Sequence, residues 1–423
     1  MIETDSKGRL CMANSNTDGS RADAAVTGSE LRSLFDRLSP FGPDLSLKHE
    51  DQRKTILAVN GNYPLEIEIA GFYHAATLEG GSPLIVQISG AGLEAIGRAL
   101  KSKSDSPVTD LRLGSRLAAD ICRGYAGIYR PGFVALGLDH FAVPDVREAL
   151  FAETDADKPQ VPCPSGDEVR RRFMEALEVG EGYGIRRPPQ EDIAAYDTYL
   201  CSQEYRQALA GFLAVIEEMR PAWAMIDTGE IPAALNFAIT REVVDMVRKA
   251  GSDAIVEAEY GATGQAGTED AYEPLKGTDL LRFAKQVAGF VKYTGAEGIS
   301  YPIGMEHAAP TSVKHEPDIM RLEVVQREIM RTAGRYVPFA QHGGTGAKKV
   351  ARGLVGKNNV NTHFLVTAAQ SIAMHVAKYR EGIAQGRKAA SGVGMYTSAS
   401  RAVLDATVAK LKECGTYGAL SAL

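Results

Sequence analysis

Residues 337–346 read VPFAQHGGTG, an apolar run that ends in a histidine and a glycine-rich turn. The apolar run is typical of a buried strand, and a neutral imidazole at its end is a common metal ligand. Glycines tolerate the dihedral angles that turn successive backbone N–H groups toward an anion. The stretch therefore indicates a metal ligand beside a phosphate-binding turn, although a plain turn after a strand explains the same pattern.

Seven more apolar runs with strand character surround this one along the chain. They cover residues 56–60, 84–88, 133–138, 222–226, 254–256, 298–303 and 357–361. Helical patterns separate them, for example Leu280, Ala284, Val287 and Val291 at the spacing of one helix face. Strands joined through helices pair in parallel. Eight such units predict an α/β fold, a (β/α)8 TIM barrel.

The spacing of the strands also predicts how the chain is divided. Residues 1–27 are rich in Ser, Asn, Asp, Thr and Gly, which predicts a mobile leader. A single catalytic barrel is expected over residues 28–395, and a C-terminal helical tail over 396–423. More residues lie between His140 and Met225 than one helix and its connecting loops need. We therefore expect an insertion over about residues 145–205, after the third strand.

Composition excludes several classes of function. The 423 residues include 47 basic and 53 acidic side chains, with no long basic run, which argues against a nucleic-acid-binding surface. Five scattered cysteines indicate neither a disulfide framework nor a thiolate zinc site. No apolar run approaches the length of a membrane span. These features predict a soluble cytoplasmic protein that acts on a small metabolite, with no membrane partner.

Histidines occupy the ends of three predicted strands. His140 follows the third strand, His307 the sixth and His342 the seventh. The carboxyl ends of barrel strands meet at one face, where active sites of this fold are built. Three imidazoles with one open position form a catalytic site for a divalent metal. A single histidine is more often a core residue, but three at strand ends favour a metal site.

Carboxylates stand next to these candidate ligands. Asp139 directly precedes His140, so its side chain is expected to point to a different side of the backbone, as a general acid or base. A helix N-cap or a hydrogen-bond partner of a ligating histidine are the alternatives. Asp227 and Glu259 end the fourth and fifth strands. They are candidates for a second metal site or for orienting the ligands, and ion pairs inside the barrel explain them equally well.

These segments together resemble the class II, metal-dependent fructose-bisphosphate aldolase family, which includes tagatose-bisphosphate aldolases. The resemblance extends over roughly residues 54–370 and rests on several motifs in family order. They are AVN at 58–60, VQISG at 86–90, LDH at 138–140, MID at 225–227, EAEYG at 257–261 with TED at 268–270, HGGTG at 342–346, and NVNT at 359–362.

The resemblance implies roles for named residues. It implies Zn²⁺ on His140, His307 and His342, with Co²⁺ or Mn²⁺ as alternatives and a monovalent cation as an optional addition. Asp139 would be the acid/base at the aldehyde oxygen, and Glu269, on a mobile loop, would handle the α-proton of the ketose. The expected substrate- and phosphate-binding residues are Asn60, Ser89, Gly343, Gly344, Thr345, Asn359, Asn361 and Thr362.

The expected reaction is therefore cleavage or condensation of a ketose phosphate or bisphosphate, most closely fructose 1,6-bisphosphate, into dihydroxyacetone phosphate and an aldehyde. A metal stabilises the enediolate that this cleavage leaves. The chain departs from the family where Ala308-Ala309-Pro310 follows His307 and where Asn361 replaces an aspartate, which leaves the substrate open. A sugar-phosphate isomerase or epimerase, and a non-catalytic sugar-phosphate-binding barrel, are the alternatives. The resemblance further implies a homodimer or higher homo-oligomer.

Overall fold

The computed structural model describes residues 2–4, 10–12, 25–62, 65–101, 106–152, 161–262, 264–265, 272–307, 312 and 314–423. Most of the predicted leader therefore lies outside the described residues. Within it, β1 (Ile2–Thr4) and β2 (Leu10–Met12) pair antiparallel. None of the helices in the described ranges is both long enough and apolar enough to cross a membrane.

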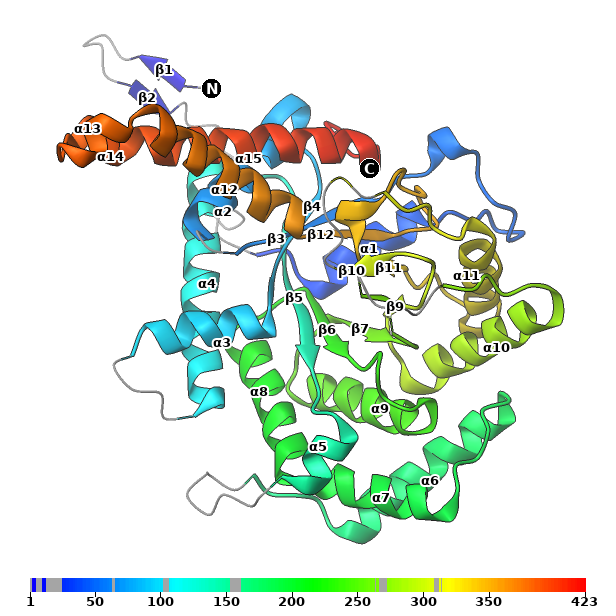
Figure 1. The fold of residues 1–423 in the computed structure, drawn as a ribbon. Coiled ribbons are helices and arrows are strands. Elements are labelled where there is room, and N and C mark those ends of the chain that lie inside the picture. The colour runs from blue at the N-terminus through cyan, green and yellow to red at the C-terminus, as the bar shows by residue number, and fades with distance from the viewer. Residues whose placement is uncertain are drawn as a thin grey trace.

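Eight parallel strands form the centre of the molecule (Figure 1). They are β3 (Ile56–Asn60), β4 (Leu84–Ser89), β5 (Val134–Ala142), β6 (Trp223–Asp227), β7 (Ile255–Glu259), β9 (Gly298–Ser300), β11 (Ala340–Gln341) and β12 (Lys357–Val360). The order in the sheet is β11-β12-β3-β4-β5-β6-β7-β9. A parallel bridge between Ile299 and Phe339 joins the two ends, and Ile299 N donates to Pro338 O at 3.1 Å. The predicted (β/α)8 TIM barrel is confirmed.

Helices follow the strands and cover the outside of the barrel (Figure 1). They are α2 (Leu65–Thr77), α3 (Gly90–Ala99), α4 (Pro107–Tyr129), α8 (Gln203–Met219), α9 (Ala233–Lys249), α10 (Gly277–Thr294), α11 (Ile319–Ala333) and α12 (Thr362–Lys378). The apolar face predicted for α10 is buried, including Leu280, Ala284 and Val287. Burial of such a face against the strands stabilises each helix more than its intrinsic propensity does.

One further helix, α1 (Gly28–Leu38), closes the amino-terminal end of the barrel. A capping box starts it, because Thr27 and Glu30 each bond to the other's backbone. Its buried apolar face packs against the first residues of the strands, and the ring of Phe35 lies 5.5 Å from that of Trp223. This end of the barrel is therefore filled by apolar side chains.

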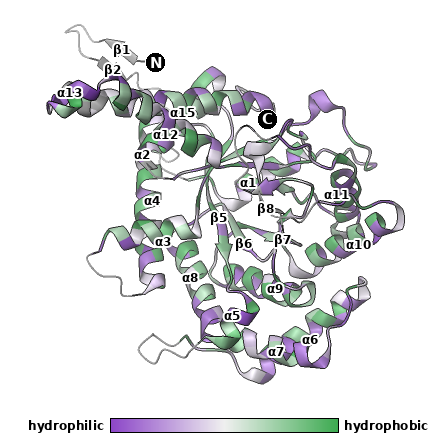
Figure 2. Ribbon diagram, viewed as in Figure 1, coloured by the Kyte–Doolittle hydropathy of each residue, from purple (hydrophilic) through white to green (hydrophobic). Residues whose placement is uncertain are grey.

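The segment between β5 and α8 contains three helices: α5 (Val146–Phe151), α6 (Gly166–Gly182) and α7 (Gln190–Cys201). They lie outside the ring of barrel helices, and α6 packs against α9 and α10 (Figure 1). Figure 2 shows many hydrophilic residues on α6 and α7. The chain thus has additional helical structure within the range predicted as an insertion.

The carboxyl-terminal part of the chain is helical. After α12 come α13 (Arg380–Ala384), α14 (Lys388–Ser391) and α15 (Val393–Cys414). The helix α15 includes much of the segment predicted as a tail, and it packs against α2, α12 and β3. Its buried residues Val403 and Leu411 belong to the main apolar cluster of the barrel. This helix is thus part of the packed wall beside the first strand.

One strand differs from the prediction. The sixth strand was expected to run through residue 303 toward His307, but β9 ends at Ser300. His307 instead lies on β10 (Glu306–His307), which pairs with β8 (Gly264–Gln265) in a separate two-stranded sheet. The positive φ of Gly304, 78°, turns the chain between the two strands. An apolar stretch containing Pro302 and this glycine gave the appearance of a longer strand.

Candidate active site

His342 lies at the centre of the polar end of the barrel. It follows β11 and is 2% exposed. Its Nε2–H donates to Glu257 Oε1 at 2.9 Å, and its Nδ1 lies 3.5 Å from Glu259 Oε1. Glu257 and Glu259 are two residues apart on β7, so both side chains point to the same side of the strand. The strand therefore presents a pair of carboxylates to one imidazole.

These carboxylates control the charge of His342. Burial alone would lower the pKa of its imidazole, but the negative charges of Glu259 and Glu257 outweigh burial and raise the pKa to about 10. Burial likewise opposes ionisation of Glu257, but Lys357 and His342 hold the pKa of its carboxyl at about 2. Lys357 Nζ donates to Glu257 Oε2 at 3.0 Å, and both side chains are completely buried.

His140 faces His342 from the end of β5. The two ring centroids are 4.5 Å apart, and His140 Nδ1–H donates to Asp227 Oδ2 at 2.9 Å. Burial disfavours the charged imidazole, but Asp139 and Asp227 together raise the pKa of His140. His140 also affects Asp227. Burial would raise the pKa of the Asp227 carboxyl, but the interaction with His140 outweighs burial and lowers it. Asp227 thus fixes the orientation of the His140 ring.

The backbone at His140 is distorted. Its φ is +33°, a left-handed value that a residue with a Cβ rarely adopts. The register between β5 and β6 shifts between Leu138 and Phe141, so that β5 has one residue more than β6 at this point. Bulges of this kind re-aim side chains and occur often next to active sites. Here the bulge turns His140 toward Asp227 and His342.

A group of three side chains offers donor atoms for a metal ion. One atom from each of His140, Glu259 and His342 lies within 4.8 Å of the others. Two imidazole nitrogens and one carboxylate oxygen form a donor set that Zn²⁺ and related divalent metals accept. The side chain of His307, the third predicted histidine ligand, is not among those described. Glu259 was predicted for a second metal site or for orienting ligands, and it lies in the group itself.

Asp139 is held beside this group by two amides. Its Oδ2 accepts from Asn60 Nδ2 at 2.6 Å and its Oδ1 from Asn359 Nδ2 at 3.3 Å. Asn60 is fixed in turn, because Gln87 Nε2 donates to its Oδ1 at 2.9 Å. Asp139 is only 3% exposed. Asn60 lies on β3 and Asn359 on β12, and Gln87, which holds Asn60, lies on β4. The carboxylate therefore faces the barrel interior, whereas His140 turns toward β6.

The glycine-rich turn after His342 packs tightly. Gly343 has φ of 69°, and a Cβ on it would lie 2.3 Å from Glu306 O. A Cβ on Gly344 would lie 2.3 Å from Asn358 Oδ1. Both positions therefore require glycine. Thr345 is held by His363, whose backbone N–H donates to Thr345 Oγ1 at 3.2 Å. The turn joins strands β11 and β12 at the edge where a phosphate was expected.

Other predicted binding residues occupy the same end of the barrel with less definite roles. Ser89 ends β4 and caps α3, since its Oγ accepts from Gly92 N at 3.1 Å. Asn361 is exposed and occupies the N-cap position of α12, and Thr362 is the first residue of that helix. Glu269 lies outside the described residues.

Three positively charged or aromatic partners of the site were missed in the sequence. Lys357 was predicted to lie on a strand, but its ion pair with Glu257 was not predicted. Trp223 Nε1 donates to the same Glu257 carboxylate. Lys314 Nζ donates to Thr345 O at 3.0 Å, which puts an ammonium group at the glycine-rich turn. A lysine within a strand is a usable signal, because a fully buried lysine needs an anionic partner. Nothing in the sequence around Lys314 indicates its position.

Known proteins share the family and the fold of this chain. Residues 209–419 match the model of the family Fructose-bisphosphate aldolase class-II. The fold is similar to fructose-bisphosphate aldolase from Campylobacter jejuni, with 15% identity, a TM-score of 0.57, and coverage of 94% of this chain and 97% of that one. The chain belongs to the class II fructose-bisphosphate aldolase family, whose members are lyases.

Two more solved structures are similar at a lower level. The YdjI aldolase from Escherichia coli K12 has 16% identity and a TM-score of 0.47, covering 87% of this chain and 94% of that one. A putative fructose-1,6-biphosphate aldolase from Coccidioides immitis has 17% identity and a TM-score of 0.46, covering 88% and 94%. No curated protein sequence matches the chain.

Proposed function

We propose that this aldolase is zinc-dependent and cleaves a ketose phosphate or bisphosphate, of which fructose 1,6-bisphosphate is the first candidate, into dihydroxyacetone phosphate and an aldehyde. The observation that carries the proposal is the juxtaposition of Asp139, held by two amides, with the donor group of His140, Glu259 and His342. A carboxylate acceptor and a metal site at adjacent residues match the two demands of carbon–carbon cleavage next to a carbonyl.

The donor group fits a divalent metal. Asp227 accepts from Nδ1 of His140, and Glu257 accepts from Nε2 of His342. Carboxylate partners of this kind fix ring orientation and raise ligand basicity. When bound, the metal supplies Lewis-acid stabilisation of negative charge on the substrate oxygens. His307 is proposed as a further ligand, with Co²⁺ or Mn²⁺ as substitutes and a monovalent cation nearby.

The protein residues handle protons and the phosphate. Asp139 accepts the proton from the C4 hydroxyl during cleavage and returns it during condensation, and Asn60 and Asn359 hold its carboxylate in place. Glu269 is proposed to exchange the proton of the ketose-derived carbon. Backbone N–H groups of Gly343, Gly344 and Thr345 are proposed to bind the phosphate, supported by the close packing of that turn. Ser89, Asn361 and Thr362 are proposed as additional contacts to the substrate.

The test is cleavage of a panel of ketose mono- and bisphosphates, monitored as aldehyde release. Chelation should abolish cleavage, and Zn²⁺ or Co²⁺ should restore it. Asp139→Asn should lower kcat by about 10²-fold or more while bound zinc is retained. Activity that survives chelation would refute the metal requirement. Product mass separates an aldolase from an isomerase or epimerase, because only an aldolase changes carbon number.

Two further features are proposed for the whole protein. A homodimer or higher homo-oligomer is proposed from the family resemblance, and sedimentation of the purified chain tests it. A cytoplasmic location is proposed from the cysteines, since Cys122, Cys163, Cys201 and Cys414 are free thiols. Fractionation of cells that make the protein tests the location.

A further inference from the structure

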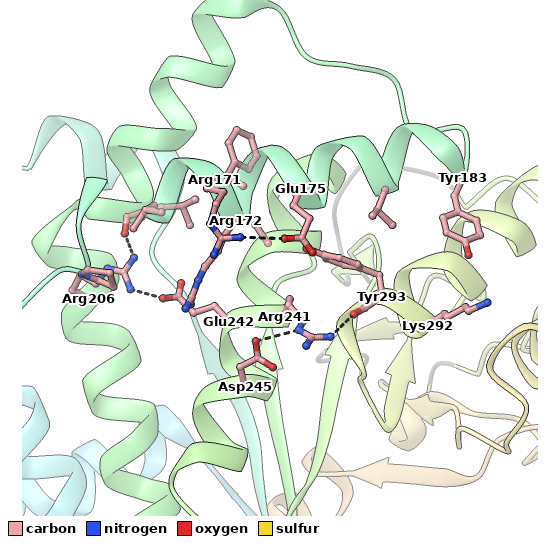
Figure 3. Close-up of a pocket in the computed structure, with 16 residues that line it drawn as sticks. Arg171, Arg172, Glu175, Tyr183, Arg206, Arg241, Glu242, Asp245, Lys292 and Tyr293 are labelled. Atoms are coloured by element: carbon pink, nitrogen blue, oxygen red, sulfur yellow. Dashed lines mark hydrogen bonds and ion pairs between the residues drawn. The ribbon is translucent and has the colours of Figure 1, made fainter. Parts of the chain in front are cut away.

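A cavity of about 590 Å³ lies away from the barrel mouth, between the helix α6 and the barrel helices α9 and α10 (Figure 3). Its lining contains five positively charged side chains and three carboxylates, so the wall carries an excess of positive charge. The cations are Arg171, Arg172, Arg206, Arg241 and Lys292, and the carboxylates are Glu175, Glu242 and Asp245. None of these residues takes part in the proposed aldolase reaction.

The carboxylate of Glu242 forms hydrogen bonds with buried side chains of the protein. Glu242 accepts from Arg206 Nη1 at 2.6 Å and from the Tyr205 hydroxyl at 2.9 Å. Arg206 is 5% exposed and lies at one end of the cavity, and its Nη2 donates to the backbone oxygen of Leu200. Arg206 and Glu242 therefore form a fixed, paired end of the cavity, and a ligand anion has to be bound by the other cations.

Two other arginines are more exposed than Arg206, since the side chains of Arg171 and Arg241 are 67% and 47% exposed. Arg171 is 3.7 Å from Glu175, which is a loose ion pair. Arg241 pairs with Asp245 along its own helix at 3.1 Å and donates to Tyr293 O at 2.9 Å. Lys292 has no carboxylate partner among the residues that the structure describes. Exposed pairs of this kind are weak and exchange readily for a better anion. Figure 3 shows Arg241 between Arg206 at one end and Lys292 at the other.

The cavity also has apolar and aromatic walls. Val169, Phe173, Leu200 and Ala238 line it, together with the rings of Tyr183 and Tyr293. The volume lies in the range of organic ligands of cofactor size and is larger than inorganic phosphate requires. A sugar phosphate would bring hydroxyl groups to these apolar walls, whereas a flat heterocycle gains from contact with aromatic rings. The walls thus match an anion that carries an aromatic ring.

We infer that this cavity binds a nucleoside phosphate, with its phosphate near Arg241 and Lys292 and its base against the apolar and tyrosine side chains. Guanidinium groups bind phosphate through paired N–H donors, which gives arginine its preference for such ligands. A ligand bound here would connect the helix α6 to α9 and α10. The inference does not rest on the proposed aldolase activity, because binding at this cavity needs neither the metal nor the substrate.

The test is calorimetric titration of the full-length protein with AMP, adenosine and inorganic phosphate, each with and without prior chelation of metal. AMP is expected to bind one site with a Kd below about 1 mM in both states, and adenosine and phosphate at least about tenfold more weakly. Amide hydrogen exchange should slow in α6 when AMP is present. Fructose 1,6-bisphosphate added to the chelated protein should not compete with AMP.

Variants locate the binding. The double variant Arg241→Ala/Lys292→Ala should weaken AMP binding at least about tenfold. The matched control is Arg282→Ala, since Arg282 is an exposed arginine of α10 that pairs with Asp279 and does not line the cavity. Failure of AMP to bind at millimolar concentration would overturn the inference. So would equal AMP affinity in the double variant, equal weakening in the control, loss of binding on chelation, or competition by fructose 1,6-bisphosphate.

Discussion

The buried ion pair between Lys357 and Glu257 gives the sharpest stability prediction. Both side chains are 0% exposed, and Lys357 Nζ is 3.0 Å from Glu257 Oε2. At that distance and an effective dielectric constant of about 20, the attraction is roughly 5 kcal/mol. Lys357→Met removes the ammonium group and leaves a carboxylate in the barrel interior. We expect the free energy of unfolding to fall by about 3 kcal/mol, because breaking a buried ion pair is strongly destabilising even though Glu257 keeps His342 and Trp223 as partners.

The measurement is urea unfolding followed by circular dichroism, with Glu257→Gln and the double variant completing a mutant cycle. Glutamine still accepts from His342, so the cycle isolates the lysine partner. The double variant should recover part of the loss, with a coupling on the order of 2 kcal/mol or more. Lys348→Met is the control, because Lys348 forms a surface pair with Glu316 at 2.7 Å and should leave stability unchanged. Additive effects in the cycle would refute the reasoning.

Three more predictions concern the site and one buried carboxyl. Gly343→Ala should raise KM for the phosphorylated substrate by about tenfold or more and lower stability, since its Cβ would lie 2.3 Å from Glu306 O. Gly334→Ala is its control, with φ of 70° and open space around the Cβ, and an equal change in KM there would contradict the clash. Zinc affinity, measured against a chromophoric chelator, should rise between pH 6 and 9 by about tenfold per pH unit for each proton that the metal displaces. The reason is that His342, with a pKa of about 10 without metal, must lose a proton before it can bind zinc. An affinity that does not change with pH would contradict this. Burial raises the pKa of Glu68 from 4.5 to about 7. The native state therefore holds this proton more tightly than the unfolded state. The contribution of Glu68 to stability should be greatest below pH 4.5 and fall by about 3 kcal/mol as pH rises to 7. Glu68→Gln should remove that slope in unfolding experiments, and an unchanged slope would show that other groups cause it.

Much of the architecture could be predicted because the barrel strands are short apolar runs and every polar strand end is at one face. The positions of Asp139, His140 and His342 followed from that rule alone. The rule assumes that a strand ends where its apolar run ends. The prediction was wrong where the apolar run continues beyond the end of the strand. Residues 301–305 continue the apolar pattern of β9, yet Gly304 turns the chain and places His307 on a different, two-stranded sheet.

The partners inside the barrel could not be predicted in the same way. Glu257 and Glu259 are two residues apart, which puts both on one face, but only the closed barrel brings His342 between them. The bulge at His140 also has no local signal, because residues other than glycine seldom have a left-handed φ and neither adjacent residue is a glycine. Lys314 contacts Thr345, which is 31 residues away in the sequence, and this contact depends on tertiary packing.

The bulge at His140 has a consequence for how this site can change. Asp139 and His140 are joined by a single peptide, yet one turns toward Asn60 and Asn359 and the other toward Asp227. Insertion or deletion of one residue in β5 would rotate both side chains together, and the proposed proton transfer and metal ligation would be lost at once. Natural or engineered variation in substrate choice is therefore expected in the loops of the other strands, with the length of β5 held constant.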